Sequence, residues 1–549
     1  MQRNIKNSCW LCIAVFFITQ TSCNKNLDRS PLSDLASNDF WTTPSNVNLA
    51  LTALYRGKIQ YLSTDAEYAP TDWWSYAGLT FLEMATDNAY DRRGDNSVFN
   101  QLTNGALTSN NANLGLYWNL SYARIARCNY FLENIGKADL TTAVRNRMIA
   151  EARFIRATQY FYLVSYYGSV PLVTHTLTLD SANTVSKAAV PDIENYTESE
   201  FVAAVADLPT MANLPASEQG RAPRQAVLAF LGRLYLFEKN WKKAADTYKQ
   251  IIDYNENIID PNYSSLFDGS NEGSKELIFQ AQYLINIASN GIDLHMNPRM
   301  CGGFSLFCPL GSLGESYDFK DGSAFSFSSP LYNPNDVGAG RDPRFGYNIM
   351  YNKSIFKGLI YSSHPDSTKA LDQTTTNVQA TRTGYSIRKY QAESVSSTAL
   401  ANSGINMPII RYAEILLSYL EAQIQLGNIN QPLLDATINK VRGRSSVNMP
   451  PVTQLDPTLL MAIMKKERRN ELAFEGIRLW DLYRWGDAIT VLQGNFYGAS
   501  FPGALKLRKA PDNSIDPFGR WYVTTKTFNA GNYPWPVPQA EININPKLK

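Results

Sequence analysis

Residues 223–252 read PRQAVLAFLGRLYLFEKNWKKAADTYKQII, and their apolar and small residues recur at regular spacing. Six of these residues have the spacing of a tetratricopeptide repeat, in which two antiparallel helices cross: Leu228, Leu231, Gly232, Tyr235, Ala244 and Tyr248. Gly232 and Ala244 are small where we expect the two helices to approach closely. Such a pair cannot bury its apolar face alone, so the segment predicts a stack of helix pairs.

Further helix pairs are predicted from apolar stripes near the 3.6-residue period: residues 114–135 with 141–167, residues 409–442, and residues 457–485. A separate helix is predicted within residues 40–57, with Thr43 as its N-cap, Pro44 at its first position and Gly57 as its terminator. The scaffold is therefore expected to be all-α and built from tetratricopeptide-like helix pairs.

A long irregular insertion interrupts these helices. Residues 286–406 are rich in Gly, Ser, Asn and Pro and lack sustained periodicity, and loops of this length on a rigid scaffold are usually functional. We expect one domain over residues 23–549, divided into a tether (24–37), an N-terminal helical scaffold (38–285), a loop-rich insertion (286–406), and C-terminal helix pairs with an extended tail (407–549).

The N-terminus has the order of a secretory signal. Arg3 and Lys6 precede an apolar run over residues 9–18, which as a helix would extend only about 15 Å, half of a bilayer core. Cleavage after residue 22 would leave Cys23 as the first residue, whose thiol could carry lipid. We expect residues 1–22 to be a lipoprotein signal peptide, with an ordinary signal peptidase site as the alternative.

Composition narrows the class of partner. The 549 residues carry a formal charge of +2, and loss of the signal would leave 49 basic and 49 acidic residues. Nucleic acid is therefore not expected as a partner. Aromatic residues make up 12% of the chain, with 31 tyrosines, and such side chains recognise uncharged polar ligands. The aromatic content favours binding of a neutral polar ligand.

Cysteine and histidine give little support to metal or redox chemistry. The three histidines are far apart in sequence, so neither a metal site nor a cofactor is expected. After removal of the signal and acylation of Cys23, three cysteines would remain. Cys128 is expected to be a buried core residue, and a Cys301–Cys308 bridge is left open.

Residues 67–96, EYAPTDWWSYAGLTFLEMATDNAYDRRGDN, combine aromatic and polar side chains. Flat rings cover the C–H face of a pyranose while carboxylates, amides and guanidinium groups bond its hydroxyls. The predicted ligand-binding residues are Trp73, Trp74, Tyr76, Asp87, Asn88, Tyr90 and Arg92. The alternative places the tryptophans in the core and Asp87-Asn88 at a helix cap. Further candidates are Tyr317, Phe319, Tyr332, Phe345 and Tyr347 of the insertion.

Six blocks, in order and spacing, give the chain its resemblance to the SusD/RagB family of outer-membrane nutrient-binding lipoproteins: DFWTTPSNVNLALTALYRG (39–57), AEARFIRATQYFYLVSYYGSVPLV (150–173), RKYQAES (388–394), MPIIRYAEILLSYLEAQ (407–423), KERRNELAFEGIRLWDLYRWGD (466–487) and WPVPQAEININPKL (535–548). The resemblance implies a lipid-anchored, surface-exposed protein of the outer membrane. It also implies that the protein captures oligosaccharides and delivers them to a SusC-like TonB-dependent transporter.

Three other functions remain open at this stage. The RagB side of the family suggests peptide capture, and a structural assembly subunit would bind no ligand. A surface glycoside hydrolase is suggested by Glu467, Glu471 and Glu475, which share one helical stripe. Because arginines are interleaved with this stripe, ion pairing between helices is the simpler interpretation, and no catalytic residue is assigned.

Overall fold

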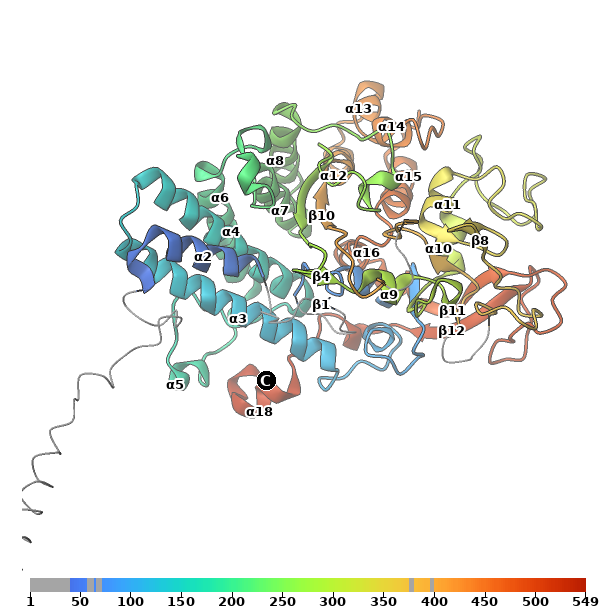
Figure 1. Cartoon of the computed structure of the whole chain (residues 1–549), viewed down its shortest axis with the longest axis horizontal. Coiled ribbons are helices and arrows are strands. Elements are labelled where there is room, and N and C mark those ends of the chain that lie inside the picture. Colours follow the sequence, from blue (N-terminus) through green and yellow to red (C-terminus); the bar gives the residue numbers. More distant parts are fainter. Residues whose placement is uncertain (1–39, 57–63, 66–71, 375–379, 395–398) are drawn as a thin grey trace, which may run out of the picture.

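The computed structural model describes residues 40–56, 64–65, 72–374, 380–394 and 399–549. Figure 1 shows long helices gathered at one end of the molecule, with the loop-rich segments and the longest strands at the other. The predicted signal peptide, Cys23 and the tether over 24–37 lie outside the described residues. Among the helices that the structure describes, none has both the length and the apolar character needed to cross a membrane.

The scaffold helices pack in series. They are α2 (Pro44–Tyr55), α3 (Ala112–Asn134), α4 (Thr142–Tyr167), α6 (Val190–Asp207), α7 (Arg224–Phe237), α8 (Trp241–Asp253), α12 (Tyr412–Gln425), α15 (Pro457–Glu471) and α16 (Arg478–Trp485). Helix α3 packs against α4, and the contacts then run through α6, α7, α8 and α12 to α15. This series confirms the predicted scaffold of stacked helices.

Helices α7 and α8 cross closely, as residues 223–252 predict. A Cβ atom built on Gly232 would lie 2.5 Å from Cζ of the Tyr248 ring, so only hydrogen fits there. Ala244 and Tyr248 are both fully buried. The tyrosine ring therefore occupies the space that the glycine leaves open, which is the packing expected of a tetratricopeptide pair.

The predicted ends of two helices are confirmed. The Thr43 hydroxyl accepts a hydrogen bond from the Asn46 N–H at 3.3 Å, and Pro44 is the first residue of α2. Helix α4 ends at Gly168, whose φ of 71° is readily adopted only by glycine. Gly57, the terminator predicted for the first helix, lies outside the described residues.

The helix predicted to start at Ile409 starts later. Residues Met407–Arg411 form strand β10, which pairs antiparallel with β3 (Leu277–Ala281), and α12 begins only at Tyr412. Pairing with β3 directs this backbone into a ladder instead of a helical turn. The second helix of the pair is also divided at Thr437 into α13 (Gln431–Ala436) and α14 (Ile438–Arg442).

The insertion contains only short elements, which agrees with its lack of periodicity. They are β4 (Ser289–Asn290), α9 (Ile292–Met296), β5 (Phe307–Pro309), α10 (Gly311–Ser316), α11 (Pro343–Asn348), β6 (Ile349–Met350), β7 (Ile355–Phe356), β8 (Leu359–Ile360) and β9 (Ser386–Ile387). Over the described residues every sheet has two strands, including β1 (Thr64–Asp65) with β4 and β2 (Ala89–Asp91) with β5. The prediction of an all-α scaffold with a loop-rich insertion is confirmed.

The C-terminal part differs from the sequence expectation in two respects. Strands β11 (Gln493–Ser500) and β12 (Arg520–Thr527) form an antiparallel hairpin that was not predicted. The tail, expected to be extended, forms helix α18 (Gln539–Ile544) after its prolines. Trp535 is buried and stacks on Tyr166 of α4 at 4.6 Å, so the tail is anchored to the scaffold. The short helices α5 (Leu179–Ala182) and α17 (Ala488–Val491) complete the set.

The cysteines that the structure describes form no disulfide bond. Cys128, Cys301 and Cys308 are free thiols, so the Cys301–Cys308 bridge that the sequence left open is not formed. Cys128 is fully buried, as predicted.

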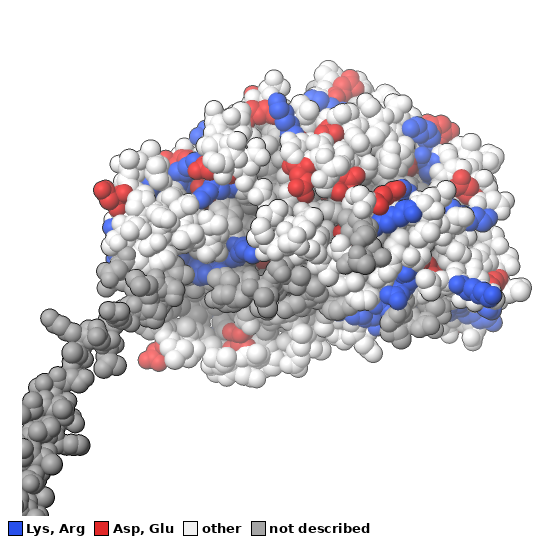
Figure 2. Space-filling model, in the orientation of Figure 1, with Lys and Arg blue, Asp and Glu red and all other residues white. Residues whose placement is uncertain are grey.

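Figure 2 shows acidic and basic side chains interspersed over the visible face. Recognition on that face therefore depends on local contacts rather than on an extended field of one sign.

Candidate ligand-binding site

Trp73, the first predicted binding residue, is part of the core. Its side chain is fully buried, and its ring stacks on Tyr117 at 4.2 Å and on Tyr162 at 4.6 Å. Its indole N–H donates to the Ser121 hydroxyl at 2.7 Å. Both faces and the polar edge are therefore occupied by side chains of α3 and α4. This burial corrects the prediction that Trp73 contacts a ligand.

Trp74 and Tyr76 have similar surroundings. Trp74 is 4% exposed, donates to the Tyr162 hydroxyl at 3.2 Å, and has the Arg124 guanidinium 5.1 Å from its ring centroid. Tyr76 is fully buried, with its hydroxyl 3.0 Å from Nδ1 of His295. Neither ring presents a face to solvent, so both are core residues.

Asp87 and Asn88 connect the N-terminal part to α15 and α16. Asp87 forms ion pairs of 2.9 Å with both Arg469 and Arg478. Burial alone would raise the pKa of Asp87, but the two guanidinium groups lower it well below its usual range. Asn88 is fully buried and accepts a hydrogen bond from Nε of Arg469 at 2.7 Å. Both residues therefore stabilise the fold. They act neither as the predicted ligand contacts nor as the helix cap of the alternative interpretation.

Tyr90 and Arg92, the last two predicted residues, are 4% and 8% exposed. The Tyr90 hydroxyl donates to Asp95 at 2.9 Å. The backbone N–H of Arg92 donates to the carbonyl of Leu306, which ties this segment to the insertion. All seven residues are thus buried, because helices and loops from distant parts of the sequence cover residues 72–92.

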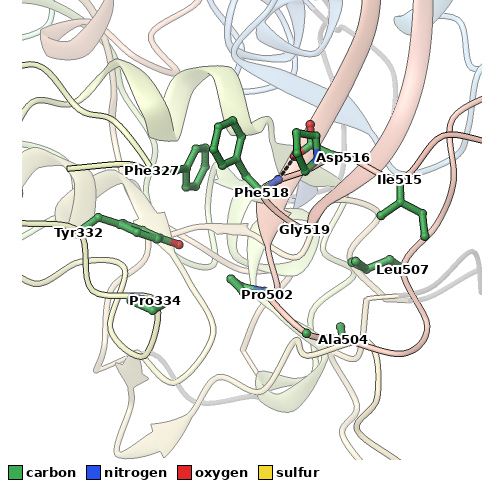
Figure 3. Close-up of a pocket in the computed structure, with 12 residues that line it drawn as sticks. Phe327, Tyr332, Pro334, Pro502, Ala504, Leu507, Ile515, Asp516, Phe518 and Gly519 are labelled. Carbon is green, nitrogen blue, oxygen red and sulfur yellow. Dashed lines mark hydrogen bonds between the residues drawn. The ribbon is translucent and has the colours of Figure 1, made fainter. Parts of the chain in front are cut away.

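The structure offers a different concave site at the loop-rich end. A pocket of about 670 Å³ lies between residues 501–519, which connect β11 to β12, and residues 325–334 of the insertion (Figure 3). Side chains from both loops line it, including Phe327, Tyr332, Pro502, Leu507, Ile515 and Phe518. The volume lies within the range of sites for small ligands.

Three aromatic rings form one wall of this pocket. Phe327 stacks on Phe518 with a centroid distance of 4.9 Å, and Tyr332 stands almost perpendicular to Phe327 at 5.2 Å. Phe518 is 41% exposed, and Ile515 beside it in the same loop is 52% exposed. Large apolar side chains that are left open in a concave site indicate a binding surface.

Asp516 and Arg520 hold the loop that carries Phe518. The Asp516 carboxylate accepts the Phe518 N–H at 3.0 Å and pairs with Arg520 at 2.7 Å. Arg520 also pairs with Glu315 of α10 at 3.2 Å. Burial alone would raise the pKa of Asp516, but the Arg520 hydrogen bond and charge lower it below its usual range. Asp516 therefore remains a carboxylate at neutral pH. Glu315 and Arg520 add half-buried polar groups beside the rings.

The insertion side of the pocket rests on a buried cation. The Arg341 guanidinium lies 3.8 Å from the ring centroid of Phe325, which packs on Phe327. Arg341 also donates to the carbonyls of Gly314 and Tyr317 at 2.6 Å each. Burial lowers the pKa of Arg341 to about 10, so the cation persists at neutral pH. These contacts fix the base of the aromatic loop.

Of the three aromatic rings in the pocket wall, one belongs to a residue that the sequence predicts as a candidate. Tyr332 was a candidate from the insertion, whereas Phe327 and Phe518 were not selected. Of the other insertion candidates, Tyr317, Phe319 and Phe345 are buried, and Tyr347 is half-buried. Residues 511–520 (PDNSIDPFGR) contain a usable signal, because Ile515 and Phe518 interrupt a run of turn-forming residues and so cannot be buried in regular structure.

The three glutamates of the predicted stripe all form ion pairs, but only Glu467 and Glu471 lie on α15, because this helix ends at Glu471. The Glu471 carboxylate accepts hydrogen bonds from Arg344 at 2.8 Å and from Arg411 at 2.7 Å, and it also pairs with Arg444. Burial would raise the pKa of Glu471, but the three guanidinium groups lower it well below its usual range. Glu467 is likewise buried and pairs with Arg344 and Arg442, and the half-buried Glu475 pairs with Lys389 and Arg411. Ion pairing of the stripe is confirmed, but the interleaved arginines do not provide it: Arg468, Arg469, Arg478 and Arg484 pair with other carboxylates.

Comparisons with known proteins agree with this architecture. A family model described as the SusD family matches residues 255–549, and one described as starch-binding associating with outer membrane matches residues 27–236. The crystal structure of a SusD-like carbohydrate binding protein from Bacteroides fragilis is 46% identical, with a TM-score of 0.89 over 93% of this chain and 100% of that chain.

Two more distant relatives extend the comparison. A SusD-like protein of Formosa agariphila is 23% identical over 96% of this chain and 95% of its own length. Surface glycan-binding protein A from Bacteroides thetaiotaomicron, solved with laminarihexaose, shares the fold with a TM-score of 0.66 at 19% identity, over 92% of this chain and 99% of that chain. The match to the family model over more than half of the sequence, with the close likeness to the Bacteroides fragilis structure, shows that this chain belongs to the SusD family.

Proposed function

We propose that this protein binds oligosaccharides in the pocket formed by Phe327, Tyr332 and Phe518, and that it performs no bond cleavage of its own. The observation that carries the proposal is the exposed aromatic wall, whose rings come from two loops and are held by Asp516 and Arg520. A ring face of this kind suits the C–H side of a sugar, and neighbouring polar groups suit its hydroxyls.

The family supports this choice of ligand. The SusD-like protein of Bacteroides fragilis is described as carbohydrate binding, and one of the solved structures of the same fold is a complex with laminarihexaose. We propose further that Cys23 carries lipid, that the chain is held at the outer membrane, and that the bound glycan is passed to a TonB-dependent transporter. The description of the model matching residues 27–236 is the support for the outer membrane.

Catalysis by the glutamate stripe is not supported by its surroundings. A glycoside hydrolase needs one carboxylic acid with a raised pKa and access to substrate. Glu471 is fully buried, and three arginines keep it ionised. The function proposed here therefore excludes a role for Glu471 in hydrolysis. Peptide capture is the competing proposal, because an apolar pocket also accepts side chains of peptides.

Isothermal titration of the purified protein with panels of neutral oligosaccharides and oligopeptides tests the proposal. We expect heat from at least one oligosaccharide, and we expect Phe518→Ala to weaken that binding by about 5-fold, since a ring contact is worth ~1 kcal/mol. Leu179→Ala is the control, because Leu179 is 77% exposed on α5 at the opposite end of the molecule. Binding of peptides alone, or equal binding by both variants, would contradict the proposal.

A further inference from the structure

Two arginines, one of them in a loop that lines the pocket, have no carboxylate partner among the residues that the structure describes. Arg382 precedes β9, and Arg508 belongs to the loop of residues 501–519. Among the described residues neither forms an ion pair, whereas Arg520 of the pocket pairs with both Asp516 and Glu315. Both side chains are half-buried, so their guanidinium groups keep access to a ligand.

Contacts through β2, β5 and β12 place both arginines around Tyr90. Tyr90 of β2 is the cross-strand partner of Cys308, whose sulfur accepts the backbone N–H of Arg382 at 3.4 Å. Arg508 donates to the carbonyl of Val523 on β12 at 2.9 Å. Thr524, the next residue after Val523, shares the Asp95 carboxylate with the Tyr90 hydroxyl, so Arg508 and Arg382 approach Tyr90 from β12 and from β5. Burial and Asp95 raise the pKa of Tyr90, and the charges of Arg382 and Arg508 oppose this rise.

The arginine side chains retain capacity for a ligand. The Arg382 side chain makes no hydrogen bond to any described residue, and its Nε is buried without an acceptor. Arg508 uses Nη1 on a backbone carbonyl and lies over the Tyr522 ring at 5.0 Å. A buried N–H without an acceptor is costly, and a planar oxyanion would satisfy several N–H groups of a guanidinium at once.

Two carboxylates lie near Tyr90, and neither forms an ion pair with Arg382 or Arg508 among the described residues. Asp95 accepts hydrogen bonds through Oδ1 from the Tyr90 hydroxyl at 2.9 Å and from the Thr524 hydroxyl at 2.7 Å. It forms no ion pair with Arg382 or Arg508, and Asp91 nearby is taken by Arg93 at 2.7 Å. The local charge therefore stays positive. The Tyr90 and Thr524 hydroxyls orient Asp95, so the guanidinium groups of Arg382 and Arg508 remain available to a ligand.

The arginine pair adjoins the pocket through the chain itself. Leu507 lines the pocket, and Arg508 is the next residue. A linear ligand in the pocket could therefore extend towards Tyr90 and the arginines. Elsewhere in the same loop the charges are mixed, because Lys506 and Lys509 are exposed and the Asp366 carboxylate accepts the backbone N–H groups of Leu505 and Lys506 at 2.8 and 2.9 Å.

We infer that Arg382 and Arg508 form a subsite for an anionic substituent of the bound glycan, a sulfate ester or a carboxylate. The inference rests on the proposed function and names the substrate class of that site. Guanidinium groups bind both kinds of oxyanion in a bidentate manner, and the aromatic wall of the pocket would hold the neighbouring sugar ring.

Binding measurements with matched polysaccharides test the inference. The purified protein is titrated with a sulfated galactan, with the same galactan after chemical desulfation, and with polygalacturonate. We expect one of the anionic probes to bind at least about 10-fold more tightly than the desulfated galactan. Preference for the sulfated galactan assigns a sulfate ester, and preference for polygalacturonate assigns a carboxylate.

Substitutions of the two arginines test whether these side chains bind the anionic group. Arg382→Gln and Arg508→Gln should each weaken binding of the preferred anionic probe by about 10-fold and leave the desulfated galactan unaffected. Lys509→Gln is the matched control, since it removes the same charge from an exposed position of the same loop, and it should change affinity by less than about 2-fold. Arg382→Lys should still lose affinity, because an ammonium keeps the charge and loses the bidentate geometry.

Failure of this inference differs from failure of the proposed function. Equal affinity for the sulfated and desulfated galactans, with no gain for polygalacturonate, overturns the anionic subsite while glycan binding in the pocket stands. An equal loss in Lys509→Gln also overturns it, because the effect would then be one of general charge. If none of these probes nor any neutral oligosaccharide binds, the proposed function and this inference both fall.

Discussion

Trp73 and Phe518 are both aromatic and both lie among polar residues in the sequence, yet their surroundings in the structure are opposite. Trp73 is covered by tyrosines of α3 and α4, whereas Phe518 is 41% exposed in a loop. The residues that bury Trp73 follow it by about forty to ninety positions, so no local pattern reveals them. At the scale of the residue, type alone did not separate a core ring from a binding ring.

A pair of substitutions makes this difference measurable. Trp73→Ala should lower the free energy of unfolding by ~3–5 kcal/mol, because it opens a cavity between packed rings. Phe518→Ala should change stability by less than ~0.5 kcal/mol, since the ring is partly exposed, and should instead weaken glycan binding. Urea unfolding measures the first effect and calorimetric titration the second. A Trp73→Ala variant of normal stability with reduced binding would return Trp73 to the ligand site.

Glu471 makes a pH-dependent contribution to stability. Its pKa in the folded protein lies well below its value of about 4.3 in an unfolded chain, despite burial, because Arg444, Arg411 and Arg344 surround it. The contribution is therefore fully present above the unfolded pKa and is lost as pH falls towards the folded value. Between pH 5 and pH 3 we expect the free energy of unfolding to decrease with falling pH.

The variant Glu471→Gln tests this origin. It should cost ~3–5 kcal/mol at pH 7, because three buried arginines lose their anion, and it should flatten the pH dependence between pH 5 and pH 3. Asp246→Asn is the control, since Asp246 pairs with Lys242 on the surface and contributes ~0.5 kcal/mol or less. An unchanged slope in Glu471→Gln would assign the acid sensitivity to other carboxylates.

At the scale of the element, the crossing of α7 and α8 depends on one missing side chain. Gly232→Ala places a Cβ atom 2.5 Å from the Tyr248 ring, so we expect a loss of ~1–3 kcal/mol despite the better helix propensity of alanine. Gly115→Ala in α3 is the matched control, because nothing lies within 4 Å of its Cβ position, and it should stabilise by ~0.5–1 kcal/mol. Thermal unfolding of the two variants measures both signs, and a stabilised Gly232→Ala would refute the close crossing.

Elements with a strong local pattern could be predicted, and elements that depend on distant partners could not. The spacing of Gly232 and Tyr248, and the cap of Thr43, are local, and the structure has both. The start of strand β10 is not predicted from the sequence, because its partner β3 lies more than a hundred residues earlier and leaves no local pattern. The pocket was missed for the same reason, since Phe327 and Phe518 meet only after the loops of β11–β12 and of the insertion are brought together.

At the scale of the whole molecule, contacts join the first and last parts of the chain. Asp87 pairs with Arg469 and Arg478, the buried Lys526 donates to the carbonyl of Thr86 at 2.6 Å, and Trp535 stacks on α4. Two family models match residues 27–236 and residues 255–549 separately, but the boundary between them falls near the α8–α12 interface. These contacts favour one cooperative unit.

We therefore expect that residues 40–254 do not fold alone. In such a fragment Arg233 loses Glu414, its bidentate partner at 2.6 and 2.7 Å, which leaves a buried charge uncompensated at a cost of ~3–5 kcal/mol. The face of α8 that packs on α12 would also be exposed to water. Near-ultraviolet circular dichroism and urea unfolding should show no cooperative transition for the fragment and a single one for residues 40–549. Co-expression with residues 255–549 should restore the transition, because it returns Glu414, Arg469 and Arg478. A sharp transition in the isolated fragment would instead divide the protein into two independent domains.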